Sequence, residues 1–322
     1  MPVITNSDYR ASKLLFNGHL ETIVPGILRK AKPVPYERER FELRDGDFID
    51  LDWLRKDSET LIILLHGLEG NSRRYYIQNL VWAMDNNNWD ILSVNCRSCS
   101  EEMNRNFKLY HHGQTEDLKE VIEDNLIDKP YSNIILVGFS MGGSQLIKLL
   151  GENGNDLPMQ IKGGVAISTP CNLGDSARAL SKKSNHIYRK RFIEKLVRKL
   201  KIKAAQFPDL LDVDGIDDVK HFYELDKYTA QMNGFESAGK FYDYASANNY
   251  IAHIKKPVLL INAINDPMLP QSCFPFEKAR DHKFFFFEAT KRGGHCGFYK
   301  PGDKETWLER RIVSFIKAKI LT

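Results

Sequence analysis

A serine in a Gly-x-Ser-x-Gly sequence is the first residue of this chain whose surroundings predict covalent chemistry. Ser140 lies three positions after the end of the apolar run 134–137 and is followed by apolar residues at helical spacing. A serine at a sharp turn between a buried strand and a helix is exposed for attack on a carbonyl carbon. Gly138 and Gly142 allow the strand and the helix to approach closely, because side chains there would clash. The pattern predicts that Ser140 is a nucleophile.

Two backbone N–H groups are candidates to bind the oxyanion that such an attack creates. Met141 begins the helix after Ser140, where its N–H is free and the helix dipole is positive. Leu68 follows the apolar strand 60–65, and Gly67 beside it lets the backbone approach the reacting atoms. We interpret His66, in the same loop, as a residue that braces the loop and does not transfer protons.

An aspartate and a histidine complete the candidate catalytic group. Asp266 follows the apolar strand 257–263, and His295 lies on a glycine-rich loop after the strand 283–288. A serine needs a base to take its proton, and His295 is the histidine whose position fits. Asp266 would fix the tautomer of that histidine and stabilise its imidazolium form. We assign Cys296, the neighbouring rival nucleophile, to packing, because it does not lie at a turn between a strand and a helix.

The composition excludes several other classes of protein. The net charge of the 322-residue chain is +4, which is too small to indicate a nucleic-acid partner. Five cysteines in a long chain argue for a reducing compartment, and no leader or membrane-spanning run is present, so we expect a cytoplasmic protein. Cys96 and Cys99 form a single C-x-x-C without a second half, so we expect no metal. No sequence indicates a cofactor.

The elements that must position these residues alternate between apolar strands and amphipathic helices. The sequence predicts an antiparallel hairpin over 37–55, followed by six further strands that are joined mainly by helices. We therefore expect an α/β fold with a mostly parallel eight-stranded sheet that is flanked by helices. Strand patterning stops after the sixth strand, so residues 171–249 are predicted to form a helical cap. The core is then made of residues 1–170 and 250–322.

The first half of this cap contains a basic amphipathic helix, which we expect over residues 182–203. Ten basic residues and one acidic residue occupy this range, together with apolar residues from Ile187 to Leu200 at helical spacing. Such a helix can rest on an anionic membrane surface. It can equally pack its apolar face on the core and leave a solvated basic face, which is the interpretation that we favour.

Five motifs together resemble the YheT-type branch of the α/β-hydrolases, and the resemblance covers nearly the whole chain. The motifs begin at Asn17 (Asn-Gly-His-Leu-Glu-Thr-Ile), His66 (His-Gly-Leu-Glu-Gly), Leu109 (Leu-Tyr-His-His-Gly-Gln-Thr-Glu-Asp-Leu), Gly138 (Gly-Phe-Ser-Met-Gly-Gly) and Gly293 (Gly-Gly-His-Cys-Gly-Phe). This branch includes bacterial esterases, yeast medium-chain fatty-acid ethyl ester synthases and mammalian abhydrolase phospholipases. The resemblance implies the triad Ser140, Asp266 and His295. Ser98 and Glu101 depart from it, since the family would have glycine at both positions.

The sequence thus predicts a serine hydrolase that cleaves short- to medium-chain acyl esters through an acyl-enzyme. One alternative is acyl transfer to an alcohol or lipid, or phospholipase activity, because any nucleophile that enters before water can resolve an acyl-enzyme. A second alternative is a binding protein of the same fold that has lost activity. Substrate choice is expected to depend on the cap, whose composition is evident from the sequence but whose pocket shape is not.

Overall fold

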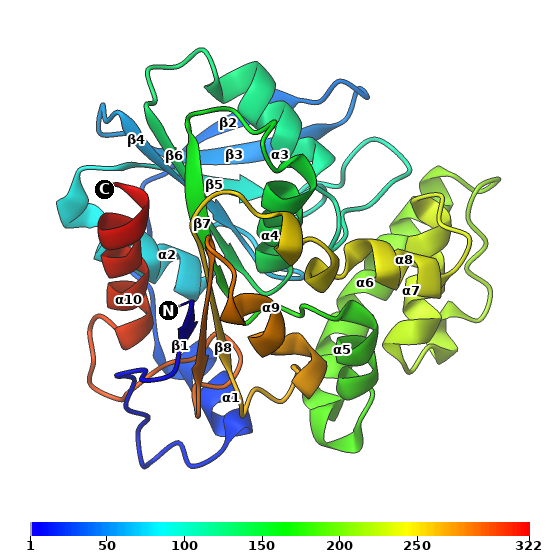
Figure 1. The fold of residues 1–322 in the computed structure, drawn as a ribbon. Helices are drawn as coiled ribbons and strands as arrows, with labels where there is room; N and C mark the ends of the chain where they lie inside the picture. Colours follow the sequence, from blue (N-terminus) through cyan, green and yellow to red (C-terminus); the bar gives the residue numbers. More distant parts are fainter. Residues whose placement is uncertain (1) are drawn as a thin grey trace.

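One sheet forms the centre of the computed structural model, which describes residues 2–322 (Figure 1). Its strands follow the order β1-β9-β8-β7-β6-β4-β5-β3-β2. The pairs β2–β3 and β3–β5 are antiparallel, and all other pairs are parallel. The strands are β1 (Val3–Ile4), β2 (Glu37–Glu42), β3 (Phe48–Leu54), β4 (Thr60–Leu65), β5 (Asp90–Asn95), β6 (Asn133–Phe139), β7 (Ile161–Ile167), β8 (Val258–Ala263) and β9 (Phe285–Thr290).

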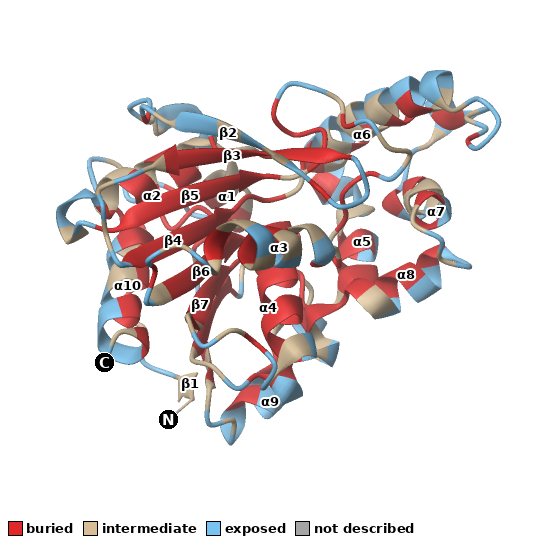
Figure 2. Ribbon diagram, turned by 90° about the horizontal axis from the view of Figure 1, so that it is seen from above, coloured by how far each residue is buried: buried red, intermediate tan, exposed pale blue. Residues whose placement is uncertain are grey.

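Continuous apolar sequence explains the middle of this sheet. Every residue of β4 and β5 is buried (Figure 2), and so is every residue of β8, as expected for strands that have helices on both faces of the sheet. The prediction of an α/β fold with a mostly parallel sheet is confirmed. The described chain adds a ninth strand that the sequence did not predict, because β1 has only two residues, which pair with Phe287 and Glu288 at the edge.

Helices cover both faces of the sheet. Residues of α2 and α10 pack with one face of the strands, and residues of α3, α4 and α9 pack with the other. Helix α10 continues directly into a π-helical segment, Ile316–Ile320. The helices are α1 (Gly18–Leu28), α2 (Tyr75–Ala83), α3 (Glu116–Glu120), α4 (Met141–Asn153), α5 (Leu173–Leu180), α6 (His186–Gln206), α7 (Phe222–Met232), α8 (Ala238–Ala245), α9 (Phe276–Arg280) and α10 (Trp307–Phe315).

Four helices, α5 to α8, lie between β7 and β8, where the sequence predicts the cap. They share an apolar cluster that is separate from the two clusters on the sheet, and Figure 1 shows α6, α7 and α8 to one side of the sheet. No helix within residues 2–322 combines the length and the apolar character that a membrane crossing requires.

The basic helix of the cap differs from the prediction in its bounds and in the partners of its lysines. Helix α6 begins at His186 and ends at Gln206, later at both ends than the predicted 182–203. Ile187, predicted on the apolar face, is 66% exposed. Lys199 and Lys203 point inward, since the ammonium group of Lys199 lies 2.6 Å from Glu69 Oε1 and that of Lys203 donates to two backbone carbonyls. These two lysines fasten α6 to loops of the core.

Candidate active site

Ser140 occupies a strained turn between β6 and α4. Its backbone has φ 53° and ψ −113°, a left-handed conformation that is costly for a residue with a side chain. A Cβ atom on Gly138 would lie 2.3 Å from the carbonyl oxygen of Gly142, and one on Gly142 would lie 2.5 Å from that of Leu65. Only glycine fits at these two positions, as the sequence predicts. The turn leaves the Ser140 hydroxyl accessible at the end of the strand.

The structure brings Ser140, His295 and Asp266 together. His295 Nε2 lies 3.0 Å from Ser140 Oγ, and His295 Nδ1 lies 2.7 Å from Asp266 Oδ2. Because a carboxylate oxygen only accepts, Nδ1 carries the proton and Nε2 is free to accept from the serine. Asp266 Oδ1 accepts from the backbone N–H of Met268 at 2.8 Å, which fixes the carboxylate plane. This geometry allows a proton to pass from Ser140 to His295.

Helix α1 holds the loops that carry the acid and the base, a role that the sequence did not predict. The fully buried Glu21 carboxylate accepts from Asn265 Nδ2 at 2.5 Å and from the backbone N–H of Gly293 at 3.1 Å. Thr22 Oγ1 accepts from the backbone N–H of His295 at 2.9 Å. The first family motif, which contains Glu21 and Thr22, thus braces both loops. That these two residues belong to the motif was the only indication of these contacts in the sequence.

Two free N–H groups flank Ser140 at the positions predicted for oxyanion donors. Leu68 follows β4 and lines the pocket above Ser140, and Met141 is the first residue of α4. Within residues 2–322, neither N–H donates to a protein acceptor. A Cβ atom on Gly67 would lie 3.2 Å from the Cβ of Ser140, which shows how closely this loop approaches the serine.

His66 braces this loop, as expected. Its Nδ1 donates to the carbonyl of Gly67 at 2.8 Å, and its Nε2 accepts from the backbone N–H of Cys96 at 3.1 Å. Burial lowers the pKa of His66 to about 4, so the ring is neutral and both nitrogens are used.

A buried ion pair joins the cap to the residue after Leu68. Glu69 has a left-handed backbone, and its Oε1 accepts from the Tyr110 hydroxyl at 2.5 Å and from Lys199 of α6 at 2.6 Å. The side chains of Lys199 and Glu69 are only 12% and 7% exposed. The Tyr110 hydroxyl also accepts from the backbone N–H of Glu69 at 3.0 Å. This ion pair therefore links the Leu68 loop to α6.

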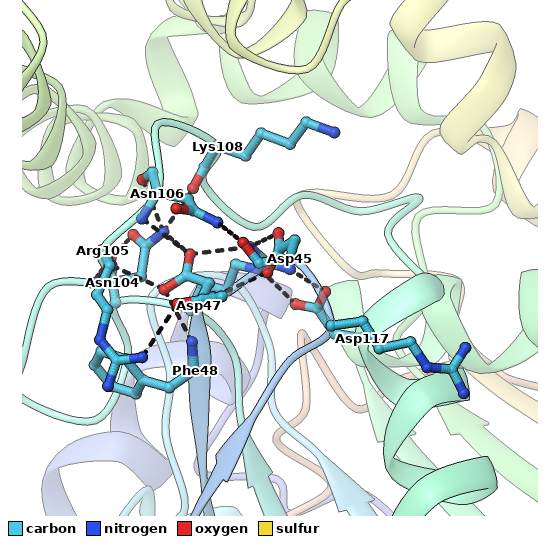
Figure 3. Close-up of polar contacts among 12 residues, drawn as sticks. Asp45, Asp47, Phe48, Asn104, Arg105, Asn106, Lys108 and Asp117 are labelled. Atoms are coloured by element: carbon cyan, nitrogen blue, oxygen red, sulfur yellow. Dashed lines mark hydrogen bonds and ion pairs between the residues drawn. The ribbon is translucent and has the colours of Figure 1, made fainter.

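The loop that departs from the family pattern keeps the backbone that glycine would favour. Ser98 and Glu101 have φ 60° and φ 81°, so both adopt the left-handed conformation without being glycine. Polar contacts hold the loop that follows against the turn between β2 and β3 (Figure 3). There the buried Asp47 accepts from Asn104 Nδ2 at 2.5 Å and from Arg97 Nη1 at 2.9 Å.

A mostly apolar pocket opens beside Ser140 and His295 and extends into the cap. Its volume is about 720 Å³, including the part that is open to solvent. Helices α5 to α8 and the segment after Asp266 supply most of the wall. Its larger apolar residues include Leu173, Leu180, Phe192, Phe222, Phe241 and Leu269. Such a lining suits an acyl chain.

No cysteine thiol takes part in the hydrogen bonds that join Ser140, His295 and Asp266, although Cys99 Sγ lies 3.6 Å from Lys199 Nζ. Cys296 is buried and its backbone N–H donates to Ser168 Oγ at 2.9 Å; burial raises the pKa of its thiol, so it is a poor nucleophile. Burial likewise raises the pKa of Cys99 to about 11. Within residues 2–322, no three His, Cys, Asp or Glu side chains are grouped as metal ligands would be.

The chain is similar in sequence and in fold to known hydrolases. The family model described as alpha/beta hydrolase fold matches residues 60–300. The chain is 31% identical over 310 residues to the Escherichia coli protein YheT, named as a candidate esterase, and the match covers 93% of this chain and 90% of that protein. It is 26% identical over 332 residues to the human Phospholipase ABHD3, covering 99% and 80%. Among solved structures, the esterase Pf2001 of Pyrococcus furiosus superposes with a TM-score of 0.61 at 19% identity, covering 90% of this chain and 96% of that one.

Proposed function

Because the chain belongs to the YheT-type branch of the α/β-hydrolase fold family and is an esterase-type hydrolase, we propose that it cleaves short- to medium-chain acyl esters through an acyl-enzyme on Ser140. The observation that carries the proposal is the pair of hydrogen bonds from His295, at 3.0 Å to Ser140 and at 2.7 Å to Asp266. The proposal includes the predicted division of the chain, in which residues 171–249 form a cap over this site and the remaining residues form the core.

In the first half of the reaction, Ser140 Oγ attacks the ester carbonyl while His295 Nε2 accepts the serine proton. Asp266 stabilises the imidazolium that results. The N–H groups of Leu68 and Met141 bind the oxyanion, and each such donor lowers the barrier by about 3 kcal/mol. His295 then protonates the leaving alcohol, and the acyl group stays on Ser140.

Water completes the cycle. It attacks the acyl carbonyl while His295 Nε2 takes one of its protons, and the proton then returns to Ser140 as the carboxylic acid leaves. The apolar pocket beside Ser140 holds the acyl chain, and its length limits the chains that fit.

A fluorophosphonate probe tests the nucleophile. Wild type should be labelled, and Ser140→Ala should not be labelled. Ser176→Ala is the matched control, because Ser176 lines the same pocket but contacts Cys273 and not His295. Labelling that survives Ser140→Ala would refute the assignment. A series of p-nitrophenyl esters of graded chain length would then define the acyl specificity.

Phospholipase activity with the same three residues is the second candidate. The human relative that aligns with 99% of this chain is named a phospholipase, and the pocket beside Ser140 is mostly apolar. Release of fatty acid from phosphatidylcholine with short acyl chains should be compared with release from matched p-nitrophenyl esters. Hydrolysis of the simple esters alone would exclude this candidate. Added ethanol separates hydrolysis from acyl transfer, since transfer gives the ethyl ester.

A further inference from the structure

One carboxylate faces the pocket from the cap, and the proposed mechanism leaves it unused. Asp226 lies on α7, and Phe222 and Thr229, one turn before and one turn after it, line the pocket beside it. Residues at this spacing share one face of a helix, so Asp226 lies on the face toward the pocket, where it is partly buried. Among the pocket-lining residues of the described chain, Asp226 is the only carboxylate.

The chain itself uses only part of the hydrogen-bonding capacity of Asp226. Its Oδ2 accepts from the Tyr242 hydroxyl at 2.7 Å, and within residues 2–322 its Oδ1 takes part in no hydrogen bond. An ionised carboxylate in apolar surroundings is costly unless it is paired. Burial accordingly raises the pKa of Asp226 to about 7. One oxygen of this acid is therefore available to a molecule in the pocket.

The remaining wall of the pocket favours a cation near Asp226. His111 and His112 line the same pocket, and burial lowers their pKa values to about 3 and about 4, so both rings are neutral and repel no cation. The rings of Phe222 and Phe241 also line it, and aromatic faces attract cations. The charge that the cap presents to the pocket is negative.

We propose that Asp226 binds a protonated amine of the substrate, and that the enzyme selects acyl esters whose chain carries a primary ammonium group. The inference rests on the proposed function, in which the ester carbonyl lies at Ser140. The ammonium N–H donates to the free Oδ1 and neutralises the carboxylate, and the alkyl spacer packs on apolar side chains such as Leu173 and Leu269. A hydroxyl end group supplies a hydrogen bond without neutralising the charge, and a methyl end group supplies neither.

Three matched series of p-nitrophenyl esters test this specificity, with chains of graded length that end in an ammonium, a hydroxyl or a methyl group. At about pH 8 the amine is protonated and Asp226 is largely ionised. At the length that spans the pocket, wild type should prefer the ammonium ester over the methyl ester by about tenfold or more in kcat/KM. Asp226→Asn should lose that preference, so that its kcat/KM on the ammonium ester falls to about its kcat/KM on the methyl ester. Asp243→Asn, an exposed acid on α8, is the matched control and should behave as wild type.

Two results would overturn the amine site. One is an equal loss on all three esters in Asp226→Asn, because a purely structural role gives that result. The other is a wild-type preference for methyl or hydroxyl esters at every length. Fluorophosphonate labelling of Ser140 in the same samples separates the two proposals. Labelled enzyme without an ammonium preference rejects only the amine site, and unlabelled enzyme rejects the proposed function.

Discussion

Replacing Lys199 by methionine removes the cation that pairs with Glu69 while keeping most of the apolar stem of the side chain. The two side chains are 12% and 7% exposed, so the pair is buried. Breaking a buried pair from one side costs about 3–5 kcal/mol, because the remaining charge has lost its compensation. Glu69 keeps the hydrogen bond from Tyr110 at 2.5 Å. We therefore expect Lys199→Met to lower the free energy of unfolding by about 3 kcal/mol, the lower end of that range.

Urea denaturation of four proteins measures this effect. Lys199→Met should be compared with Glu69→Gln/Lys199→Met, in which the new side-chain amide oxygen still accepts from Tyr110 and no charge is left unpaired. The double variant should recover at least about 2 kcal/mol. Lys201→Met is the control, because its ion pair with Asp217 is 45% and 77% exposed and should contribute less than about 1 kcal/mol. The reasoning fails if Lys199→Met costs no more than Lys201→Met, or if the double variant is as unstable as the single one.

The same substitution should also slow the reaction, because Glu69 directly follows the proposed oxyanion donor Leu68. Complete loss of one donor lowers kcat by about 10²–10³. A loosened loop misplaces the donor only part of the time, so we expect kcat of Lys199→Met to fall about tenfold while KM changes less than about threefold. An unchanged kcat would show that the Leu68 loop keeps its position without the lysine of the cap.

Three further predictions concern the turn, the 98–101 loop and the acid of the pocket. Gly138→Ala places a methyl group 2.3 Å from a carbonyl oxygen, so it should lose about 3 kcal/mol of unfolding free energy and most activity; a near-native urea midpoint would contradict the geometry. Glu101→Gly relieves a left-handed backbone at an exposed residue and should leave Tm unchanged or higher. Ser98→Gly loses two hydrogen bonds and should lower the free energy of unfolding by about 1 kcal/mol. Equal changes of Tm in the two variants would contradict this distinction. The pKa of Asp226 rises from 3.8 to about 7 on folding, so the native state binds the carboxyl proton more tightly than the unfolded state does. Ionisation of Asp226 therefore lowers the free energy of unfolding as the pH rises from about 4 to about 7. The stability of wild type relative to Asp226→Asn, measured as urea midpoints, should therefore fall across that window, and a constant difference would exclude the shift.

Ser140, Asp266 and His295 could be located from the sequence because each follows an apolar strand that is recognisable by itself. The carboxyl ends of parallel strands meet at one edge of a sheet, so residues that follow β6, β8 and β9 must lie near one another. The role of the two glycines of the turn could also be predicted, because close packing of β6 on α4 leaves no room for a side chain at either position. Local pattern and sheet topology were sufficient for these residues.

Glu21 and Thr22 could not be assigned in this way. Their contacts with the His295 loop span more than 270 positions of the chain, and local patterning around them indicates only a helix. A carboxylate on an amphipathic helix usually faces solvent, whereas Glu21 is fully buried by contacts with Asn265 and Gly293. Such contacts depend on how α1 lies against β8 and β9, which no short-range pattern specifies.

The composition of the cap likewise does not predict which of its charged residues line the pocket, and this bears on substrate choice. The composition of residues 182–203 predicts a basic face, but Lys199 and Lys203 are used inside the molecule, and the residues of α6 that line the pocket are Phe192 and Leu196. The acid that lines it comes from α7, whose sequence shows no charge pattern of note. A substrate that enters the pocket therefore meets apolar and neutral polar side chains and Asp226, and the lysines of α6 do not line the pocket. Electrostatic selection by this cap should favour cations, although its longest helix is strongly basic.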